Sequence, residues 1–134
     1  MHSKNNIYSL WYTGSSGYGA KGIELAASIT GNANLSIDNN LVSDLRGDGW
    51  TSLLSDAIVG IRLGAVKLPE ATILSGTTNG LKLYNNTVNL TSGSYAGYNA
   101  ATLSAALYLY WGSTPTGVTG IDIRNNIFVS NLVL

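Results

Sequence analysis

Short runs of alternating apolar and polar residues recur along the chain, and the clearest of them end in a pair of asparagines. In Leu35–Asn40 the apolar side chains stand at every second position, and the pair Asn39-Asn40 follows directly. Strict alternation over a short run is typical of a β-strand with one buried face. The same arrangement occurs again in Leu81–Asn86 and Ile121–Asn126, and a shortened first copy is Lys4–Asn6.

Two further strand types follow the asparagine pairs. The first begins directly after the pair, and its copies are Ile7–Leu10, Leu41–Leu45, Thr87–Leu90 and Ile127–Ser130. The second comes after a loop rich in Gly and Ser, and its copies are Gly22–Leu25, Gly60–Leu63 and Ala106–Leu109. Strand types that return in the same order predict a repeat architecture, in which each copy stacks on the previous one.

A solenoid explains this recurrence better than a globular β-fold does. Stacked copies place equivalent residues above one another, so the same side chain is selected at the same position in each copy. Short strands with turn signals also suit an antiparallel sandwich or barrel, but there successive strands differ in burial. The sequence therefore predicts an all-β, right-handed parallel β-helix of about three and a half rungs, with three strands per rung. Residues 1–134 would form one such domain, as a fragment of a longer solenoid.

The second asparagine of each pair is expected to form a ladder along the stack. A bend between two strands leaves backbone groups without partners, and asparagine tolerates left-handed backbone angles while its amide bonds nearby groups. Amides in adjacent copies can also bond each other, because each carries a donor and an acceptor. Two residues after the pair, a large side chain recurs and is expected to face the core. The ladder residues are Asn6, Asn40, Asn86 and Asn126, and the large residues are Tyr8, Val42, Val88 and Phe128.

The pattern apolar, any, apolar, any, Asn-Asn, any, apolar resembles that of the pectate-lyase-like right-handed parallel β-helix superfamily, over nearly the whole chain. More narrowly, Leu35–Leu63 and Leu81–Trp111 look like the β-helix repeats of large secreted or cell-surface proteins of Bacteroidetes-type bacteria. The resemblance implies a secreted or cell-surface location, with the export signal outside this chain. The superfamily contains polysaccharide lyases, glycoside hydrolases, phage tailspikes and adhesins, so the resemblance does not transfer one reaction.

The composition narrows the partners that such a solenoid would bind. Charged residues make up 10% of the chain, and seven basic residues balance seven acidic ones. No electrostatic field then draws the chain to nucleic acid or to an anionic membrane surface. No run of residues approaches the length of an apolar membrane span. Nucleic acid and membrane insertion are therefore not expected, and without cysteine neither disulfides nor thiolate sites can form.

The sequence predicts no catalytic residue, no cofactor and no metal site. The one histidine, His2, lies at the start of the chain, so no Ser-His-Asp triad can be assembled. A calcium site needs several carboxylates together, whereas the acidic residues are spread over the copies. Asp44, Asp48 and Asp56 come nearest to such a group within one loop region, but spacings of this kind arise readily by chance.

Aromatic residues gather in the loops that follow the second strand type. Exposed rings flanked by Asn, Ser and Thr suit sugar binding, because a ring packs on the apolar face of a sugar while amides and hydroxyls bond its hydroxyl groups. Rings folded inward would instead hold the long loops against the flank of the solenoid. Both interpretations remain open from the sequence. The candidate glycan-binding residues are Trp11, Tyr12, Tyr18, Trp50, Tyr95 and Tyr98.

The sequence favours a noncatalytic scaffold or adhesion module of a secreted or cell-surface protein, which contacts polysaccharide or glycan through its aromatic loops. An alternative is a fragment of a polysaccharide lyase or glycoside hydrolase whose active cleft needs further rungs. A self-assembling fibre subunit is a third hypothesis. No capping helix is visible at either end, so uncapped strand edges predict self-association, in particular through Ile127–Leu134.

Overall fold

The computed structural model describes residues 4–12, 19–25, 34–47, 58–64, 80–91, 104–110 and 121–131. These residues form strands β1 to β12 and no helix. The strands are β1 (Asn6–Ile7), β2 (Leu10–Trp11), β3 (Lys21–Leu25), β4 (Asn34–Asp38), β5 (Leu41–Ser43), β6 (Leu45–Arg46), β7 (Ile58–Gly64), β8 (Gly80–Tyr84), β9 (Thr87–Thr91), β10 (Ser104–Tyr110), β11 (Ile121–Arg124) and β12 (Ile127–Asn131).

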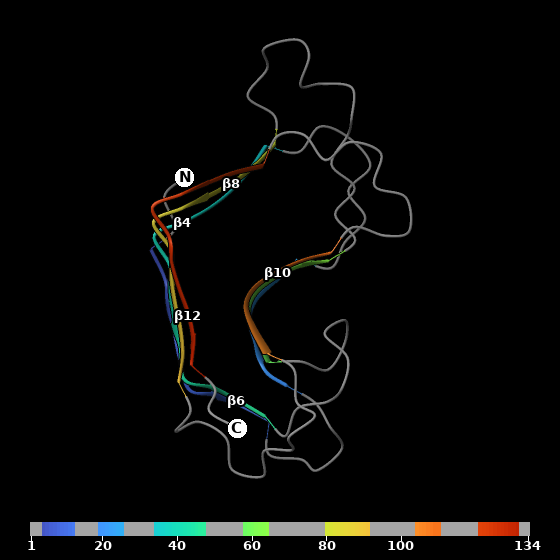
Figure 1. Cartoon of the computed structure of the whole chain (residues 1–134), viewed down its shortest axis with the longest axis vertical. Helices are drawn as coiled ribbons and strands as arrows, with labels where there is room; N and C mark the ends of the chain where they lie inside the picture. Colours follow the sequence, from blue (N-terminus) through green and yellow to red (C-terminus); the bar gives the residue numbers. More distant parts are fainter. Residues whose placement is uncertain are drawn as a thin grey trace.

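The strands form four sheets, and neighbouring strands in each sheet come from successive copies of the repeat (Figure 1). The four-stranded sheet has the order β1-β5-β9-β12, the β7 sheet has the order β3-β7-β10, and the β8 sheet has the order β4-β8-β11. Strands β2 and β6 form a pair. All of these pairings are parallel, so an antiparallel sandwich does not describe these strands. The all-β, parallel part of the prediction is confirmed; the sheets are separate, and the described residues do not close them into complete rungs.

Two kinds of bend lead from one sheet to the next. At the asparagine bend, which joins the β8 sheet to the four-stranded sheet, Asn39, Asn85 and Asn125 have φ angles of 57°, 56° and 54°. At the second bend, which joins the four-stranded sheet to the β2–β6 pair, Ser9 and Asp44 have φ angles of 56° and 50°. Left-handed angles strain most side chains, and short polar residues tolerate them because they bond the local backbone. Both bends therefore place a short polar residue at the position with the left-handed angle.

The strand register corrects the predicted alignment of the first copy. Asn6 pairs with Leu41 and Ile7 pairs with Val42, so Asn5, and not Asn6, stands at the position of Asn40. Tyr8, which was expected to face the core, is 60% exposed, and Ile7 packs against the core in its place. An apolar residue therefore does stand two positions beyond the ladder asparagine in the first copy, but it is Ile7, two residues after Asn5.

Side-chain amides of four asparagines form a chain of hydrogen bonds along the asparagine bend. Asn5 Nδ2 donates to Asn40 Oδ1 at 2.8 Å, and Asn40 Nδ2 donates to Asn86 Oδ1 at 2.9 Å. Asn86 Nδ2 donates in turn to Asn126 Oδ1 at 3.0 Å. The ladder bonds of Asn5, Asn40 and Asn86 are therefore all donated toward the copy that follows in the chain.

Asn86 is the most completely enclosed member of this ladder, with an exposed fraction of 0%. Its Oδ1 also accepts from the backbone N of Asn40 at 3.1 Å, and its Nδ2 also donates to the carbonyl oxygen of Ile37 at 2.8 Å. The side chain thus uses two donors and two acceptor positions, which is the full capacity of an amide group. Burial without loss of hydrogen bonds is what lets a polar side chain stand beside the core.

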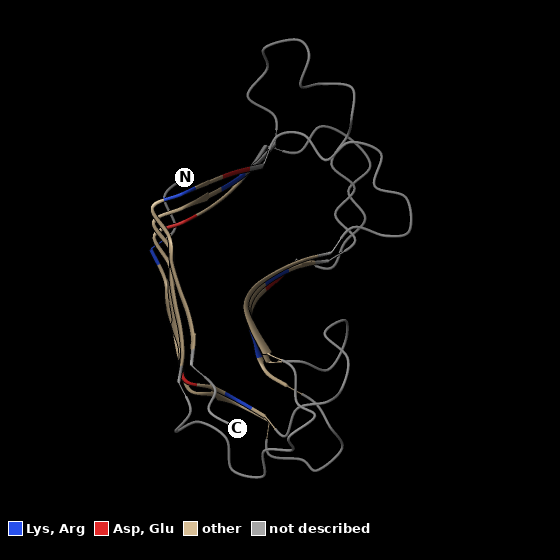
Figure 2. Ribbon diagram, viewed as in Figure 1, with Lys and Arg blue, Asp and Glu red and all other residues tan. Residues whose placement is uncertain are grey.

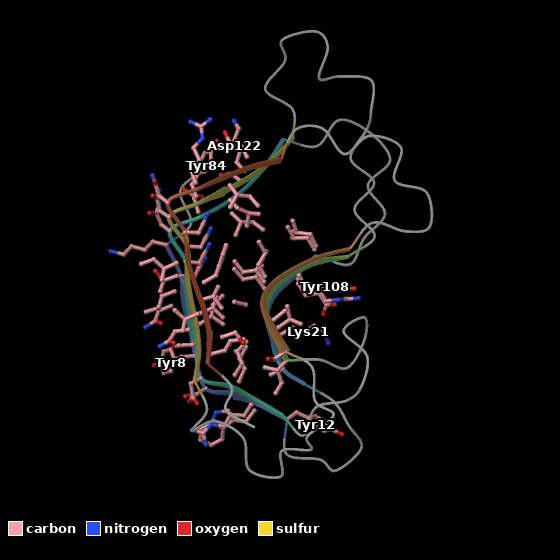
Figure 3. All side chains as sticks on the ribbon, viewed as in Figure 1. Tyr8, Tyr12, Lys21, Tyr84, Tyr108 and Asp122 are labelled. Atoms are coloured by element: carbon pink, nitrogen blue, oxygen red, sulfur yellow. The ribbon has the colours of Figure 1, made fainter. Side chains whose placement is uncertain are left out.

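Apolar side chains of the four-stranded sheet, the β7 sheet and the β8 sheet pack together in the interior (Figure 3). They lie in columns, because register partners in neighbouring strands carry side chains on the same face. One column on the four-stranded sheet joins Ile7, Val42, Val88 and Phe128, and a column on the β7 sheet joins Ile23, Ile61 and Leu107. The residues fully enclosed in these two columns belong to the middle copies: Val42, Ile61 and Val88.

The β7 sheet approaches the four-stranded sheet so closely that one position has no room for a side chain. A Cβ atom built on Gly60 would overlap Val88 Cγ1 and would lie 2.6 Å from the carbonyl oxygen of Ala106. A Cβ atom on Gly22 would overlap Val42 Cγ1 in the same way. Figure 1 shows the strands of the β7 sheet bending toward the four-stranded sheet. Glycine is required here because two backbones and a branched side chain meet.

Candidate functional site

Four side chains from two successive copies meet at the second bend, and we call them the Trp11 cluster: Ser9, Trp11, Asp44 and Arg46. Strands β2 and β6 bring them together, since Trp11 pairs with Arg46 and Leu10 pairs with Leu45. Leu45 is buried in the core and anchors β6. Because side chains alternate along a strand, Arg46 then faces away from the core, beside Trp11.

The Asp44 carboxylate organises the Trp11 cluster. Its Oδ2 accepts hydrogen bonds from Ser9 Oγ at 2.9 Å and from Trp11 Nε1 at 3.3 Å. Its Oδ1 accepts from Arg46 Nε at 2.8 Å. The guanidinium carbon of Arg46 lies 4.0 Å from the centroid of the Trp11 ring, which is a cation–π distance.

These contacts set the charge of the cluster. The hydrogen bond from Arg46, together with those from Ser9 and Trp11, holds the pKa of Asp44 below its usual value of 3.8, although partial burial acts in the opposite direction. Asp44 is therefore ionised at neutral pH and cancels the charge of Arg46. Figure 2 shows this red and blue pair at the bend beside the four-stranded sheet.

The cluster is open to solvent and combines an aromatic face with polar groups. Trp11 is 52% exposed, and Arg46 has further N–H donors besides the Nε that binds Asp44. An exposed indole packs well on the apolar face of a sugar ring, and the guanidinium donors can reach the sugar's hydroxyl groups. Since the contacts around Asp44 hold the ring and the guanidinium in place, little ordering would be required on binding.

An uncharged surface continues from the cluster onto the outer face of the four-stranded sheet. Strands β1, β5, β9 and β12 contain no Lys, Arg, Asp or Glu, and they appear entirely tan in Figure 2. Tyr8, Leu41, Ile127 and Val129 are exposed on these strands or beside them. Register pairs Leu41 with Thr87 and Thr87 with Ile127, so polar and apolar side chains alternate across this face.

Only part of the predicted aromatic set can be placed. Trp11 lies in the cluster, and Tyr12 follows it as a half-buried residue whose backbone N donates to the carbonyl oxygen of Arg46 at 3.1 Å. Figure 3 labels Tyr8 and Tyr12 at the two ends of this segment. The remaining candidates fall outside the described residues: Tyr18, Trp50, Tyr95 and Tyr98.

Sequence reasoning missed the polar members of the cluster. Asp44 was considered only as a calcium ligand with Asp48 and Asp56, which lie outside the described residues. Its carboxylate oxygens instead accept from Ser9, Trp11 and Arg46. Counting from Asn5 and Asn40 would have placed Ser9 and Asp44 at equivalent positions. Within the described part of the chain, no group of three or more His, Asp or Glu side chains could hold a metal ion.

A second polar group lies on the outer face of the β8 sheet. Tyr84 Oη donates to Asp122 Oδ2 at 2.7 Å, and Arg124 Nε donates to Asp122 Oδ1 at 2.6 Å. The Tyr84 and Arg124 hydrogen bonds lower the pKa of Asp122, and the same bond to Asp122 raises the pKa of Tyr84 (Figure 3). An analogous pair, Arg62 with Glu24, lies on the β7 sheet. The Tyr84–Asp122 hydrogen bond and the Arg62–Glu24 pair join neighbouring copies, whereas Asp122 and Arg124 neutralise each other within β11.

Comparisons with protein-family models, with curated proteins and with solved structures find no match to this chain. No helix among the described residues is long and apolar enough to cross a membrane.

Proposed function

We propose that the chain is a noncatalytic parallel β-helix module of a secreted or cell-surface protein, which serves as a scaffold or in adhesion and contacts neutral parts of glycans through the Trp11 cluster. The observation that carries this proposal is the exposed Trp11 ring, held by Asp44 beside the guanidinium of Arg46. The ring and the guanidinium together form an aromatic surface with hydrogen-bond donors, and the paired strands β2 and β6 hold them. The proposal depends on this site and not on the fold, since one fold serves many functions.

The strand order supports the coiling of the chain into a right-handed solenoid. In each sheet the strands follow one another in chain order, as they would if every turn of the chain added one strand to each sheet. Crossovers between parallel strands of one sheet are right-handed in nearly all proteins. This coiling is also what the resemblance to the pectate-lyase-like superfamily implies, and the family assignment is part of the proposal.

The ligand class follows from the charges of the cluster. Asp44 and Arg46 neutralise each other, and the adjoining four-stranded sheet carries no charged residue. Neither feature attracts a polyanion. A neutral polysaccharide, whose sugar rings offer apolar faces and hydroxyl groups, suits this surface better than an acidic one does.

Retention on immobilised neutral and acidic polysaccharides tests the proposal. Trp11→Ala should weaken binding to a neutral polysaccharide by about tenfold or more, as loss of an aromatic anchor does in many interfaces. Trp11→Phe should keep part of the affinity because it retains a ring. Tyr8→Ala is the matched control, since it removes an exposed ring outside the cluster, and it should bind as the wild type does.

Thermal unfolding of the same variants separates binding from packing. Trp11 is half exposed, so Trp11→Ala should change the melting temperature little. Unchanged retention for Trp11→Ala, together with a large loss of stability, would contradict the proposal and assign the ring to packing against Arg46. Binding by Tyr8→Ala that falls as far as that of Trp11→Ala would show that the cluster is not the site.

A further inference from the structure

The described strands leave two open edges, one at each end of the stack. Strands β10, β11 and β12 each pair only with the strand of the preceding copy. Strands β1, β3 and β4 each pair only with the strand of the following copy. An edge strand presents a row of backbone donors and acceptors that can pair with another chain. The pairings between strands inside the molecule show which backbone and side-chain groups a strand added at either edge would meet.

Apolar side chains at both edges have enclosed equivalents in the middle copies. Ile123 on β11 is 42% exposed, whereas its register partner Leu83 is 0% exposed. Phe128 at one end and Ile7 at the other are only partly buried, although both belong to the column of Val42 and Val88. Another copy placed on either edge would therefore bury side chains whose equivalents are already buried inside the protein.

Backbone hydrogen bonds along the asparagine bend have one direction. The backbone N of Leu41 donates to the oxygen of Asn5 at 2.8 Å, and the N of Thr87 donates to the oxygen of Asn40 at 2.8 Å. The N of Ile127 donates to the oxygen of Asn86 at 2.9 Å. By the same register, the C-terminal edge offers the carbonyl oxygen of Asn126, and the N-terminal edge offers the N–H of Asn6.

The side-chain ladder also has one direction, but its donors point to the following copy, whereas the backbone donors point to the preceding one. Asn86 donates from both its backbone N and its Nδ2 to Asn126 Oδ1, at 2.9 and 3.0 Å. Asn126 stands at the C-terminal edge, where its Nδ2 donates to the carbonyl oxygen of Leu83 at 2.8 Å, as Asn86 does to Ile37. In place of a ladder bond, this Nδ2 also donates to the carbonyl oxygen of Arg124 in its own copy at 2.9 Å. The other end of the ladder is Asn5, whose Oδ1 accepts no hydrogen bond from the described residues.

We infer that this protein binds a second copy of itself head to tail, with the β12 edge of one molecule on the β1 edge of the next. Asn126 N and Nδ2 of the first molecule donate to Asn5 Oδ1 of the second, and Asn6 N of the second donates to the oxygen of Asn126. Phe128 then packs against Ile7, as Val88 packs against Phe128 within one chain.

The same hydrogen bonds disfavour the two-fold alternatives. Two C-terminal edges would place the donors of one Asn126 against those of the other, and two N-terminal edges would place two Asn5 Oδ1 atoms together. Head-to-tail association repeats without closing, so it yields open-ended assemblies instead of a dimer. This inference does not rest on glycan binding, although the same register would place Ser130 of one molecule beside Ser9 of the Trp11 cluster in the next.

Proline substitutions can block one edge at a time. Backbone groups alternate in direction along a parallel strand, and the N–H of Ile127 points to β9, so the N–H of Ser130 points to the open edge. Ser130→Pro therefore removes an outward donor and no internal backbone bond, and proline is accepted on edge strands. Asn6→Pro does the same at the N-terminal edge. The contact of Ser130 Oγ with Ser104 Oγ at 3.4 Å is lost in Ser130→Pro and in Ser130→Ala alike. Ser130→Ala and Asn6→Ala are the controls that keep the N–H groups.

Sedimentation velocity over a wide concentration range gives the decisive readout. The wild type and both alanine controls should grow from the 14.1 kDa monomer to a ladder of larger species. Ser130→Pro alone and Asn6→Pro alone should each remain monomeric. An equimolar mixture of the two proline variants should form a dimer, because each supplies the edge that the other lacks.

Three outcomes would overturn the inference. A wild type that stays monomeric at every concentration excludes self-association through these edges. A dimer formed by Asn6→Pro alone would show that two C-terminal edges meet, and a dimer formed by Ser130→Pro alone would show that two N-terminal edges meet. Circular dichroism checks that each variant is folded. If one proline variant fails to fold, the other still tests the inference, since blocking either edge ends growth.

Discussion

The two bends of this protein solve the same backbone problem with different chemistry. Each turns the chain from one sheet into the next, and each places one residue in the left-handed region. The asparagine bend then closes with neutral amides that bond each other beside the core. The second bend closes with a carboxylate, a hydroxyl, an indole and a guanidinium at the surface. Among the described residues, the amide ladder of the first bend extends from Asn5 to Asn126, whereas the second bend is present in the first two copies.

The C-terminal copies show what the second bend requires. Strands β9 and β12 pair straight through five residues, from Thr87 to Thr91 and from Ile127 to Asn131, whereas β5 ends at Ser43. Ser43 pairs with Asn89, so Leu90 follows where Asp44 turns the second copy. Leu90 is buried, and a large apolar side chain does not favour a left-handed angle. Leucine at this position thus accompanies a continuous strand, but serine occurs in both forms, because Ser9 bends the first copy whereas Ser130 continues β12.

The largest effect is expected from the middle of the asparagine bend. Asn86→Ala removes the acceptor of Asn40 and two donors, and it leaves the buried groups that they served without partners. The free energy of unfolding should fall by about 3 kcal/mol. Asn5→Ala, at the exposed end of the ladder, should lower it by less than about 1 kcal/mol. Urea denaturation measures both, and equal losses would contradict the view that burial distinguishes the two positions.

An intermediate effect separates backbone conformation from side-chain chemistry. Asn85→Ala should cost about 1 kcal/mol because alanine resists a left-handed angle, and Asn85→Gly should be nearly neutral. Asp44→Ala should cost about 2 kcal/mol, and Asp44→Gly should recover only the conformational part, about 1 kcal/mol. Full recovery by Asp44→Gly in thermal unfolding would show that the hydrogen bonds of the Trp11 cluster do not stabilise the fold.

The smallest effect is expected from acid acting on Asp44 at the second bend. The pKa of Asp44 is lowered in the folded protein, so ionised Asp44 stabilises the fold above pH 3.8, and this contribution is lost as the pH falls through the folded value. The stability difference between wild type and Asp44→Asn should then be within about 1 kcal/mol at neutral pH and should shrink toward zero in acid. The pKa of Asp122 is lowered in both proteins, so its contribution cancels.

The Asn86→Ala penalty is the control for this pH series. The ladder amides carry no titratable group, so that penalty should stay constant over the same range. A penalty that follows pH as the Asp44→Asn difference does would mean that the two bends are coupled, and the comparison between them would fail.

The strand types and their equivalent positions could be predicted from the sequence, because they follow from the alternation of apolar and polar residues within each copy. Alternation identified the three strand types, and the equivalence of Ile23, Ile61 and Leu107 follows from it and is confirmed. The register of the first copy was predicted wrongly, because Asn5 and Asn6 are chemically identical and no preceding apolar residue fixes which of them stands at the ladder position. The correct register could have been found from the apolar residues, because Ile7 follows Asn5 at the same spacing as Val42 follows Asn40.

The Trp11 cluster could not be predicted because its contacts cross between copies. Ser9 and Asp44 are distant in sequence, and an error of one residue in the register moves every side chain of a strand to the opposite face. With Asn6 taken as the ladder residue, Trp11 and Arg46 would not have been paired. The aromatic residue was therefore found from its type, whereas its polar partners needed the structure.

Gly60 and Gly22 set how closely the β7 sheet approaches the four-stranded sheet. At these positions the backbone of the β7 sheet meets Val88 and Val42 directly, so any larger residue would have to push the two sheets apart there. The third copy carries Ala106 at the same register position and so accepts one methyl group. The separation of the two sheets is therefore set most tightly in the first two copies, where even that methyl group would overlap a valine.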